Sequence, residues 1–429
     1  MNHNPEQRLQ SLKKINRTAA AMAALLFTVT ISIAGEESNS TEPTVASDSF
    51  TNAFKDGEVS GQIRLGYLYA NPKLEGHPSP YSTAIGGQLK FETGKWYGFD
   101  AGVAFFTSHA IYPASGDMDD GTFNDELTSE AGYYDLLAEA YLDYNYEHFK
   151  IRGGRQLIDT PYADSDDIRM TPNTFEGVVA TYDYNDFSFI AAWLNRWQGP
   201  DAGVYEFVDL LEDGNGIAIL AATYEKDDLE GSLWYYRADK TADVFYGTLS
   251  DSYKFTSGIV LRGALQIGDQ SEIDNSGIDG TIYGAMAELD YSGLTLSFAY
   301  DQLQVDENKK YFGGFGGGVG FVNMFEMTAG VFTSHQSAKS WKATVAYDFS
   351  ELGIDGLSVE YDFGNFKGDI EHEANEHNLM IAYAPSDSWD MELAYDRIED
   401  VDLDIGEDKD GNPIDYSLDR VLVRVNYNF

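Results

Sequence analysis

Charged and apolar side chains alternate with a period of two along segment after segment of this 429-residue chain. Near residue 345, for example, Ala343, Val345 and Tyr347 alternate with Lys342 and Asp348. A strand points successive side chains to opposite faces, so each such segment has one apolar and one charged face. The inward face of a small barrel or sandwich would instead be packed and apolar. The pattern therefore predicts an all-β fold, a wide transmembrane antiparallel β-barrel with water inside and lipid outside.

The last nine residues, 421–429, show the same alternation most clearly. Val421, Val423, Val425, Tyr427 and Phe429 share one face, and mostly polar residues occupy the other. A chain that ends on such a strand, with an aromatic last residue, resembles the assembly signal of bacterial outer-membrane barrels. The resemblance predicts that Tyr427 and Phe429 are read by the barrel assembly machinery.

The N-terminus predicts export. Basic residues at positions 8, 13, 14 and 17 precede the apolar run 18–34, which ends on the small-residue site Ser32-Ile33-Ala34. This is the pattern of a cleaved secretory signal, residues 1–34, and it is favoured over a membrane anchor because the run is short and rich in alanine. Residues 35–57 are polar and are predicted to be a periplasmic lead-in. Residues 58–429 are predicted to form the barrel.

Turns and loops alternate along the barrel segment. Short turns are predicted near residues 94–97, 146–148, 184–186, 226–228, 254–256, 291–293, 350–355 and 385–388. Longer connections are predicted near 71–82, 110–132, 159–174, 197–214, 238–243, 268–280, 304–338, 366–375 and 398–416. These boundaries give about 18 strands, with short periplasmic turns and long extracellular loops.

Composition narrows the choice of partners. The net charge of −43 argues against a nucleic-acid partner, whose phosphates would be repelled. The chain has no cysteine, so no disulfide framework is available and stability must come from the sheet. Its 29 Tyr, 25 Phe and 6 Trp suit the aromatic girdles at the two surfaces of a membrane, so outer-membrane lipid is the predicted surrounding.

The third long loop, residues 159–174, is the first candidate for a constriction. It carries two prolines and several apolar residues, which an exposed loop has little reason to have and a loop folded into the lumen does. Its charged side chains, with one just before it, are predicted to form the pore constriction: Arg155, Asp159, Asp164, Asp166, Asp167 and Arg169.

At this loop the chain resembles the OprD family of bacterial outer-membrane porins. The matching residues are Arg152-x-Gly154-Arg155-Gln156, Asp159-Thr-Pro161, Asp167-x-Arg169-Met170-x-Pro172-Asn173-x-Phe175-x-Gly177 and the glycine-rich run from Phe312 to Phe321. The resemblance implies an 18-strand barrel narrowed by its third and seventh loops, 159–174 and 304–338. It also implies passage of small solutes, typically ones bearing a carboxylate, along a ladder of basic side chains.

Seven basic residues have the parity of the lumen face and are candidates for that ladder: Arg64, Lys90, Arg152, Arg262, Lys342, Arg420 and Arg424. Closure of a barrel pairs its last strand with its first, so Arg420 and Arg424 are expected beside Arg64. A stripe of bases can pass an anion from site to site. The alternative is that these bases merely pair with lumen acids such as Glu92, Asp100, Glu139, Asp143, Glu288 and Glu360.

The charge of the third loop leaves the preferred ion open. Its four aspartates outnumber the two nearby arginines, Arg169 in the loop and Arg155 just before it, and could favour cations at the mouth. Acids on one wall and bases on the other would create a transverse field that suits zwitterions such as amino acids. Carboxylates and amino acids are therefore the predicted solutes, with anion or cation preference undecided.

Other motifs do not amount to a site. In Ser108-His109 and Ser334-His335 the two side chains point to opposite faces of an extended chain and cannot act as nucleophile and base. His372 and His377 with their neighbouring glutamates match no closed metal site, and Asp408 to Asn412 is an incomplete calcium loop. We therefore expect no enzyme activity, no cofactor and no structural metal.

Together these features predict a passive outer-membrane channel for ions and small hydrophilic solutes. The alternative from another class is a plugged surface barrel that acts as an adhesin or a structural outer-membrane protein. Large porins are commonly homotrimers, and no residue of this chain decides for or against that assembly.

Overall fold

The structure, a computed structural model, describes residues 49–73, 76–212, 214–324, 336–369, 373–402, 415 and 417–429. The predicted signal peptide, most of the lead-in, the centre of the seventh loop at 325–335, His372 and the calcium-like segment at 408–412 lie outside the described residues.

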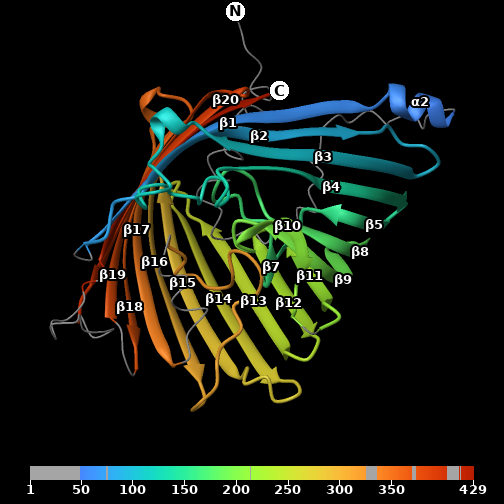
Figure 1. The fold of residues 1–429 in the computed structure, drawn as a ribbon. Coiled ribbons are helices and arrows are strands. Elements are labelled where there is room, and N and C mark those ends of the chain that lie inside the picture. Colours follow the sequence, from blue (N-terminus) through green and yellow to red (C-terminus); the bar gives the residue numbers. More distant parts are fainter. Residues whose placement is uncertain are drawn as a thin grey trace, which may run out of the picture.

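Within the described chain, eighteen long antiparallel strands form the barrel wall (Figure 1). They are β1 (Glu58–Pro72), β2 (Tyr81–Glu92), β3 (Phe99–Ala110), β4 (Tyr133–Tyr146), β5 (Phe149–Gln156), β8 (Thr174–Tyr184), β9 (Phe187–Gly199), β11 (Ile217–Lys226), β12 (Leu229–Ala238), β13 (Ala242–Lys254), β14 (Val260–Glu272), β15 (Gly280–Tyr291), β16 (Leu294–Val305), β17 (Ala338–Asp348), β18 (Leu357–Gly368), β19 (Glu373–Ser386), β20 (Trp389–Asp400) and β21 (Leu418–Asn428).

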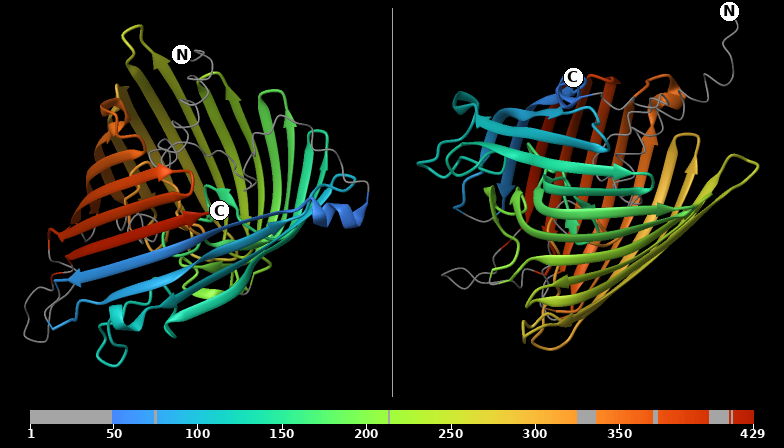
Figure 2. Two further views of the ribbon diagram at one scale, coloured as in Figure 1. Left: turned by 90° about the horizontal axis from the view of Figure 1, so that it is seen from above. Right: turned by 90° about the vertical axis from the view of Figure 1, so that its right-hand side faces the viewer.

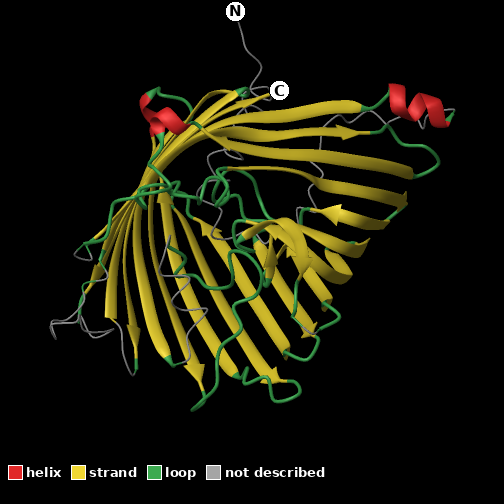
Figure 3. Ribbon diagram, in the orientation of Figure 1, coloured by secondary structure: helices red, strands yellow, loops and turns green. Residues whose placement is uncertain are grey.

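The remaining elements are short. Three small strands belong to the loops: β6 (Asp159–Thr160), β7 (Ala163–Asp164) and β10 (Val204–Asp209). The described helical segments are α2 (Phe50–Lys55), η2 (Tyr112–Ala114) and η3 (Phe349–Leu352), and Figure 3 shows them at the margins of the strand wall. None of the described helices has the length and apolar character needed to cross a bilayer.

Closure comes from pairing between the two ends of the chain. β1 and β21 pair antiparallel from Gln62↔Asn428 to Pro72↔Leu418, which confirms the predicted closed barrel of 18 strands. In Figure 2 the blue first strand lies beside the red last strand in both views. Phe429 completes the seam, because its backbone exchanges hydrogen bonds of 2.9 and 3.0 Å with Gly61.

The two faces of the wall differ as the alternation predicts. On β1, Ile63 and Leu65 are 50% and 43% exposed, whereas Arg64 between them is 2% exposed. The exposed side chains of the strands are mainly aliphatic and aromatic and so face lipid, and the polar ones face the lumen. This pattern confirms a transmembrane barrel.

The predicted turns all lie between strands. Several are two-residue hairpins, such as Asn185-Asp186 and Asp227-Asp228, in which Asn185 and Asp227 take φ values of +52° and +55°. Asn and Asp tolerate this left-handed conformation better than other residues with a Cβ, and it matches the twist of the paired strands. These short turns share one rim and the nine longer connections, numbered L1 to L9 in chain order, share the other, as predicted.

Helix α2 lies within the segment predicted to be a lead-in. Ser49 caps it by accepting a hydrogen bond from the backbone N–H of Asn52, 3.2 Å away. Phe50 and Phe54 pack against Trp96 and Phe91, at ring-centroid distances of 5.5 and 6.3 Å. The helix thereby packs against the short-turn rim just before β1 begins.

Candidate pore constriction

L3 (157–173) lies inside the barrel and reaches from one wall to the other. At one end its Asp167 contacts Arg64 on β1, and at the other its Tyr162 packs between Tyr236 of β12 and Tyr246 of β13. The small hairpin β6–β7 forms the tip, with Asp159 opposite Asp164. L3 therefore divides the lumen into a side next to the β1–β21 seam and a side next to β11–β14.

On the seam side, Asp167 is held by arginines. Arg64 donates to both carboxylate oxygens of Asp167, at 2.6 and 2.7 Å, and its Nε donates to Asn426 at 2.8 Å. Arg424 lies 3.7 Å from Asp167 and donates to Glu392 at 2.9 Å. Desolvation opposes the charge of Asp167, but the two arginines outweigh it and hold the pKa of this carboxyl below its ordinary value.

L2 (111–132) joins the same charge network. Its Glu126 accepts from Arg169 of L3 at 2.9 Å and also pairs with Arg420 of β21. Burial again opposes ionisation, and Arg420 and Arg169 keep the pKa of Glu126 below its ordinary value. Glu126 thus fastens L2 and L3 to the last strand.

L2 and L3 also make an apolar contact with the seam. Met170 of L3 and Leu127 of L2 are almost fully buried against Leu68 and Leu422 on the lumen face of the seam. Gly66 makes room for them, because a Cβ added there would lie 2.6 Å from the sulfur of Met170. The seam side of L3 is therefore packed as well as paired.

The other face of L3 is acidic. Burial, with Asp164 nearby, raises the pKa of Asp159 to about 7, and burial also raises the pKa of Asp164. The pKa of Asp166 rises to about 8, because it is desolvated and lies close to Asp164, Asp201 and Asp167. Asp159 and Asp166 are therefore partly protonated at neutral pH, unlike Asp167.

A cavity of about 400 Å³ lies between this acidic face and the wall of β11–β14. Asp159, Asp164 and Asp166 line it from L3, and Glu225 and Glu230 line it from the wall. Hydroxyl and amide side chains complete the polar lining: Thr160, Ser188, Thr223, Ser232, Thr248, Ser250, Gln266 and Asn323. No Lys or Arg is among the described residues that line it, so its fixed charge is negative.

The described part of L7 (306–324 and 336–337) forms a further part of the wall of that cavity. It pairs with L3 in parallel, since the backbone N–H of Asp164 donates to the carbonyl of Phe315 at 2.8 Å. The carboxylate of Asp301 on β16 accepts from the backbone N–H of Val322 at 2.7 Å and so fixes L7 to the wall. The glycine-rich run is thus part of the constriction.

Every base of the predicted ladder lies beside a carboxylate. Arg152 and Asp143 form a bidentate pair, with both distances 2.7 Å and both side chains 2% exposed. Lys90 lies 3.5 Å from Glu92 and 3.6 Å from Glu139. The other pairs are Arg262 with Glu288, Lys342 with Asp362 at 3.9 Å, Arg64 and Arg424 with Asp167, and Arg420 with Glu126. This is the geometry of the wall-pairing alternative, and a role of the seven bases in passing solutes stays a prediction.

Arg155 does not join the other predicted constriction residues. The β4–β5 and β5–β8 registers place it on the same face as Leu142 and Val178, which are exposed to lipid, and opposite Arg152. It pairs with Glu176 at 3.1 Å and covers the ring of Phe207. The prediction grouped Arg155 with the charged side chains of the loop that follows it, but strand β5 continues through Arg155 and alternation turns it outward.

Several constriction residues escaped the sequence analysis. L4 (200–216) also folds against L3: Asp201 accepts from Asn173 at 2.5 Å, and Tyr205 of β10 stacks on Tyr134 at 3.7 Å. The period-two run Val204-Tyr205-Glu206-Phe207-Val208 was the signal that could have predicted β10. Glu126, Tyr162, Glu225 and Glu230 carry no local signal, because their positions depend on segments distant in the chain.

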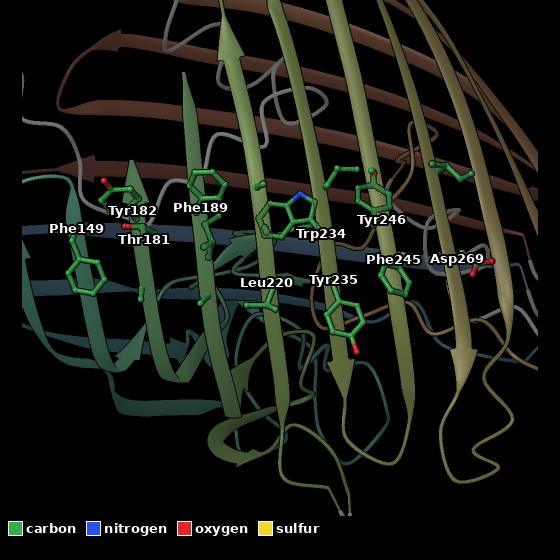
Figure 4. Close-up of a pocket in the computed structure, with 18 residues that line it drawn as sticks. Phe149, Thr181, Tyr182, Phe189, Leu220, Trp234, Tyr235, Phe245, Tyr246 and Asp269 are labelled. Carbon is green, nitrogen blue, oxygen red and sulfur yellow. The ribbon is translucent and has the colours of Figure 1, made fainter. Parts of the chain in front are cut away.

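A second concavity, of about 790 Å³, lies on the outer wall and not in the lumen (Figure 4). Phe149, Tyr182, Phe189, Leu220 and Phe245 line it and are exposed on the lipid side. It is apolar and faces the membrane, so it does not form part of a path for hydrophilic solutes. Within the described residues, no group of three His, Asp or Glu side chains could hold a metal ion.

The sequence profile of the OprD family, described as outer membrane porin, matches residues 131–396. The chain belongs to the OprD family of outer-membrane porins. This membership confirms the predicted family and places the barrel in the bacterial outer membrane. The matched segment contains L3, L4, L7 and fourteen of the wall strands in whole or part.

Solved structures of OprD-type porins share the fold. The crystal structure of Pseudomonas aeruginosa OccK8 (OprE) superposes with a TM-score of 0.71 at 16% identity, covering 88% of this chain and 99% of that one. Acinetobacter baumannii OccAB3 gives a TM-score of 0.72 at 13% identity, covering 87% and 100%. P. aeruginosa OpdK, crystallised with vanillate, gives 0.71 at 16%, covering 87% and 98%. No match was found among curated protein sequences.

Proposed function

We propose that this porin lets small hydrophilic solutes diffuse passively and selects them by charge, with a preference for solutes that carry an amino group. The cavity between L3 and β11–β14 carries the proposal. Its charged lining is entirely acidic, whereas the lumen bases lie in ion pairs on the walls. An ammonium group entering the cavity would meet carboxylates and hydroxyls that can accept its hydrogen bonds.

The basic side of L3 supports solutes of the amino-acid type over simple amines. Arg64, Arg424 and Arg169 lie on the seam side of the same loop that presents Asp164 and Asp166 on the other. A zwitterion crossing between these sides would align its carboxylate toward the arginines and its ammonium toward the aspartates. Vanillate was crystallised with OpdK, but at 16% identity that solute does not transfer to this chain.

The raised pKa values fit passage better than tight binding. Because Asp159 and Asp166 have pKa values of about 7 and about 8, they carry only part of their negative charge at neutral pH. A site of moderate charge can attract a cation and still release it, which diffusion requires. We propose no chemical step, so no enzyme activity and no cofactor belong to this function.

Single-channel recording tests the proposal. The purified protein, reconstituted in a planar bilayer under a salt gradient, should give open-channel current steps and a reversal potential whose sign marks cation preference. Swelling of proteoliposomes should be faster with a basic or zwitterionic amino acid than with a dicarboxylate of similar size. An anion-selective reversal potential would contradict the acidic cavity as the selector. Absence of current from inserted, folded protein would favour the plugged surface barrel.

A further inference from the structure

Tyr162, at the tip of L3, is fully buried in a socket of aromatic rings. Tyr236 of β12 and Tyr246 of β13 meet it edge-on, with ring centroids 5.3 and 5.8 Å away. Phe312 of L7 stacks on it at 6.4 Å, and the Tyr162 hydroxyl lies 2.5 Å from the hydroxyl of Tyr311. One side chain therefore joins L3 to L7 and to the barrel wall.

The backbones of L3 and L7 meet directly beside that socket. The N–H of Phe315 donates to the carbonyl of Tyr162 at 3.0 Å, next to the bond from Asp164 to Phe315. Gly314 and Gly316 have φ values of +92° and +100°, and Cβ atoms added to them would lie 2.7 and 2.2 Å from the carbonyls of Tyr162 and Asp164. The glycines of L7 are thus needed for this close approach.

L7 is also tied to the wall at the socket. The side chain of Gln270 on β14 accepts from the N–H of Phe312 at 2.8 Å and donates to its carbonyl at 2.7 Å. The far end of L3 is held by Arg64 through Asp167. L3 is therefore fixed at both walls, and L7 is joined to it at the end nearest the acidic cavity.

We propose that Tyr162 is the positioning residue that holds L3 and L7 as a single arch, so that Asp159, Asp164 and Asp166 keep their places over the cavity. The proposal rests on the proposed function, since the placement of these carboxyls matters only if solutes pass them. The coupling is mechanical: without the Tyr162 ring, L3 loses its contact with β12 and β13, L7 loses the side chain that joins it to L3, and the two loops can move separately.

Substitution at Tyr162 tests the first consequence in bilayer recordings. Tyr162→Ala should give noisier open-channel current and a reversal potential shifted towards zero, whereas Tyr162→Phe, which keeps the ring, should stay close to the wild type. Tyr253→Ala is the matched control, because Tyr253 lies on the same strand as Tyr246 but is 64% exposed to lipid. A folded Tyr162→Ala barrel with wild-type noise and reversal potential would overturn the proposal.

A reversible cross-link tests the coupling itself. The natural chain has no cysteine, so Ala163→Cys with Phe315→Cys, a register pair between the two loops, would form the single disulfide. In the Tyr162→Ala background, oxidation should restore the wild-type reversal potential, and reduction should remove it again. A role of Tyr162 confined to folding of the barrel would not produce such redox-reversible rescue.

The rate of cross-linking tests whether Tyr162 joins L3 to L7 even if the protein passes no current. If Tyr162 holds the loops together, the cysteine pair should form its disulfide severalfold faster in the chain that keeps Tyr162 than in the Tyr162→Ala background, and equal rates would sink the proposal. If the wild-type protein passes no current but the two cross-linking rates differ, the proposed function is refuted, while the role of Tyr162 in joining L3 to L7 stands. If Tyr162→Ala fails to show the heat-dependent gel shift of a folded barrel, Tyr162→Leu takes its place in the same comparison.

Discussion

Asp166 and Asp167 are adjacent residues of L3, yet the pKa values of their carboxyls are shifted in opposite directions. Desolvation acts on both, but Asp167 faces Arg64 and Arg424 while Asp166 faces Asp164 and Asp201. The pKa of Asp167 is therefore lowered and that of Asp166 is raised to about 8. The charge state of each carboxyl therefore depends on the neighbours that the fold supplies.

Cation preference should increase with pH. A carboxyl with a raised pKa is neutral below that value and charged above it, so Asp159 and Asp166 gain charge as pH rises through about 7 and about 8. We expect the cation-to-anion permeability ratio, from reversal potentials, to rise between pH 6 and pH 9, as roughly two elementary charges are added. Asp166→Asn should remove the upper part of that rise.

Asp239→Asn is the control for this titration. Hydrogen bonds from Asn215 hold the pKa of Asp239 below its ordinary value, so this carboxyl keeps its charge over the whole range. A ratio that stays flat from pH 6 to pH 9 in the wild type would show that Asp159 and Asp166 do not face the ion path.

Removal of the two seam arginines should also shift selectivity. Arg64→Ala with Arg424→Ala removes two positive charges from the seam side of L3 and also the partners that lower the pKa of Asp167, so anion permeability should fall markedly. Adding Asp167→Asn should return part of the wild-type ratio, because it removes the negative charge of this carboxyl. An unchanged anion-to-cation ratio in the double variant would refute a role for these bases in selection.

At the scale of the element, each wall strand has one face in contact with lipid and the other facing the lumen. β14 places Leu261, Leu265 and Ile267 in lipid, while Gln266 and Gln270 reach L7 or lumen side chains. The lumen-facing residues therefore do more than line a water-filled pore. They anchor the loops, which explains why amides and tyrosines, and not only charges, occupy the lumen face near L3 and L7.

A charge on the lipid face should be costly. Leu265 is 59% exposed and lies near the middle of β14, so Leu265→Lys should lower the free energy of unfolding by about 2–4 kcal/mol. Thr223→Lys on the lumen face of β11 should cost far less, because its ammonium reaches water and Glu225. Urea unfolding in lipid vesicles measures both, and equal losses would contradict the assigned faces.

At the scale of the whole molecule, pairing of the first and last strands closes the barrel, and inward-folded loops narrow its lumen. β1 and β21 meet along the seam, and L2, L3, L4 and L7 fold inward from separate parts of the chain (Figures 1 and 2). The seam carries the arginines that hold Asp167 and Glu126, so closure of the sheet and placement of the constriction depend on each other. A fault in closure should therefore also disturb selectivity.

Deletion of Phe429 should reduce assembly. Its backbone pairs with Gly61 across the seam. Its ring packs closely against Gly61, since a Cβ added to that glycine would lie 2.7 Å from Cζ of Phe429. If Tyr427 and Phe429 form the predicted assembly signal, a chain ending at Asn428 should reach the outer membrane in smaller amounts. Membrane fractionation with the heat-dependent gel shift measures this, and Phe429→Tyr, which keeps an aromatic end, should behave like the wild type.

The alternation of residues such as Lys342 to Phe349 was enough to predict the strands, their faces and their number, because strand geometry has a period of two and lipid and water impose it locally. Turn residues such as Asn185 and Asp227 marked the hairpins for the same reason. The family was also readable from short motifs in L3 and L7.

The partners of the charged residues depended on the tertiary structure. Asp166 and Asp167 look alike in sequence, yet Asp167 lies beside arginines from β1 and β21, whereas Asp166 lies beside acids from L3 and L4. Arg155 shows the same limit, since the point where β5 ends and L3 begins decided its face. Local geometry is set by neighbours in the chain, whereas charge pairing and desolvation are set by neighbours in space, which only the closed barrel brings together.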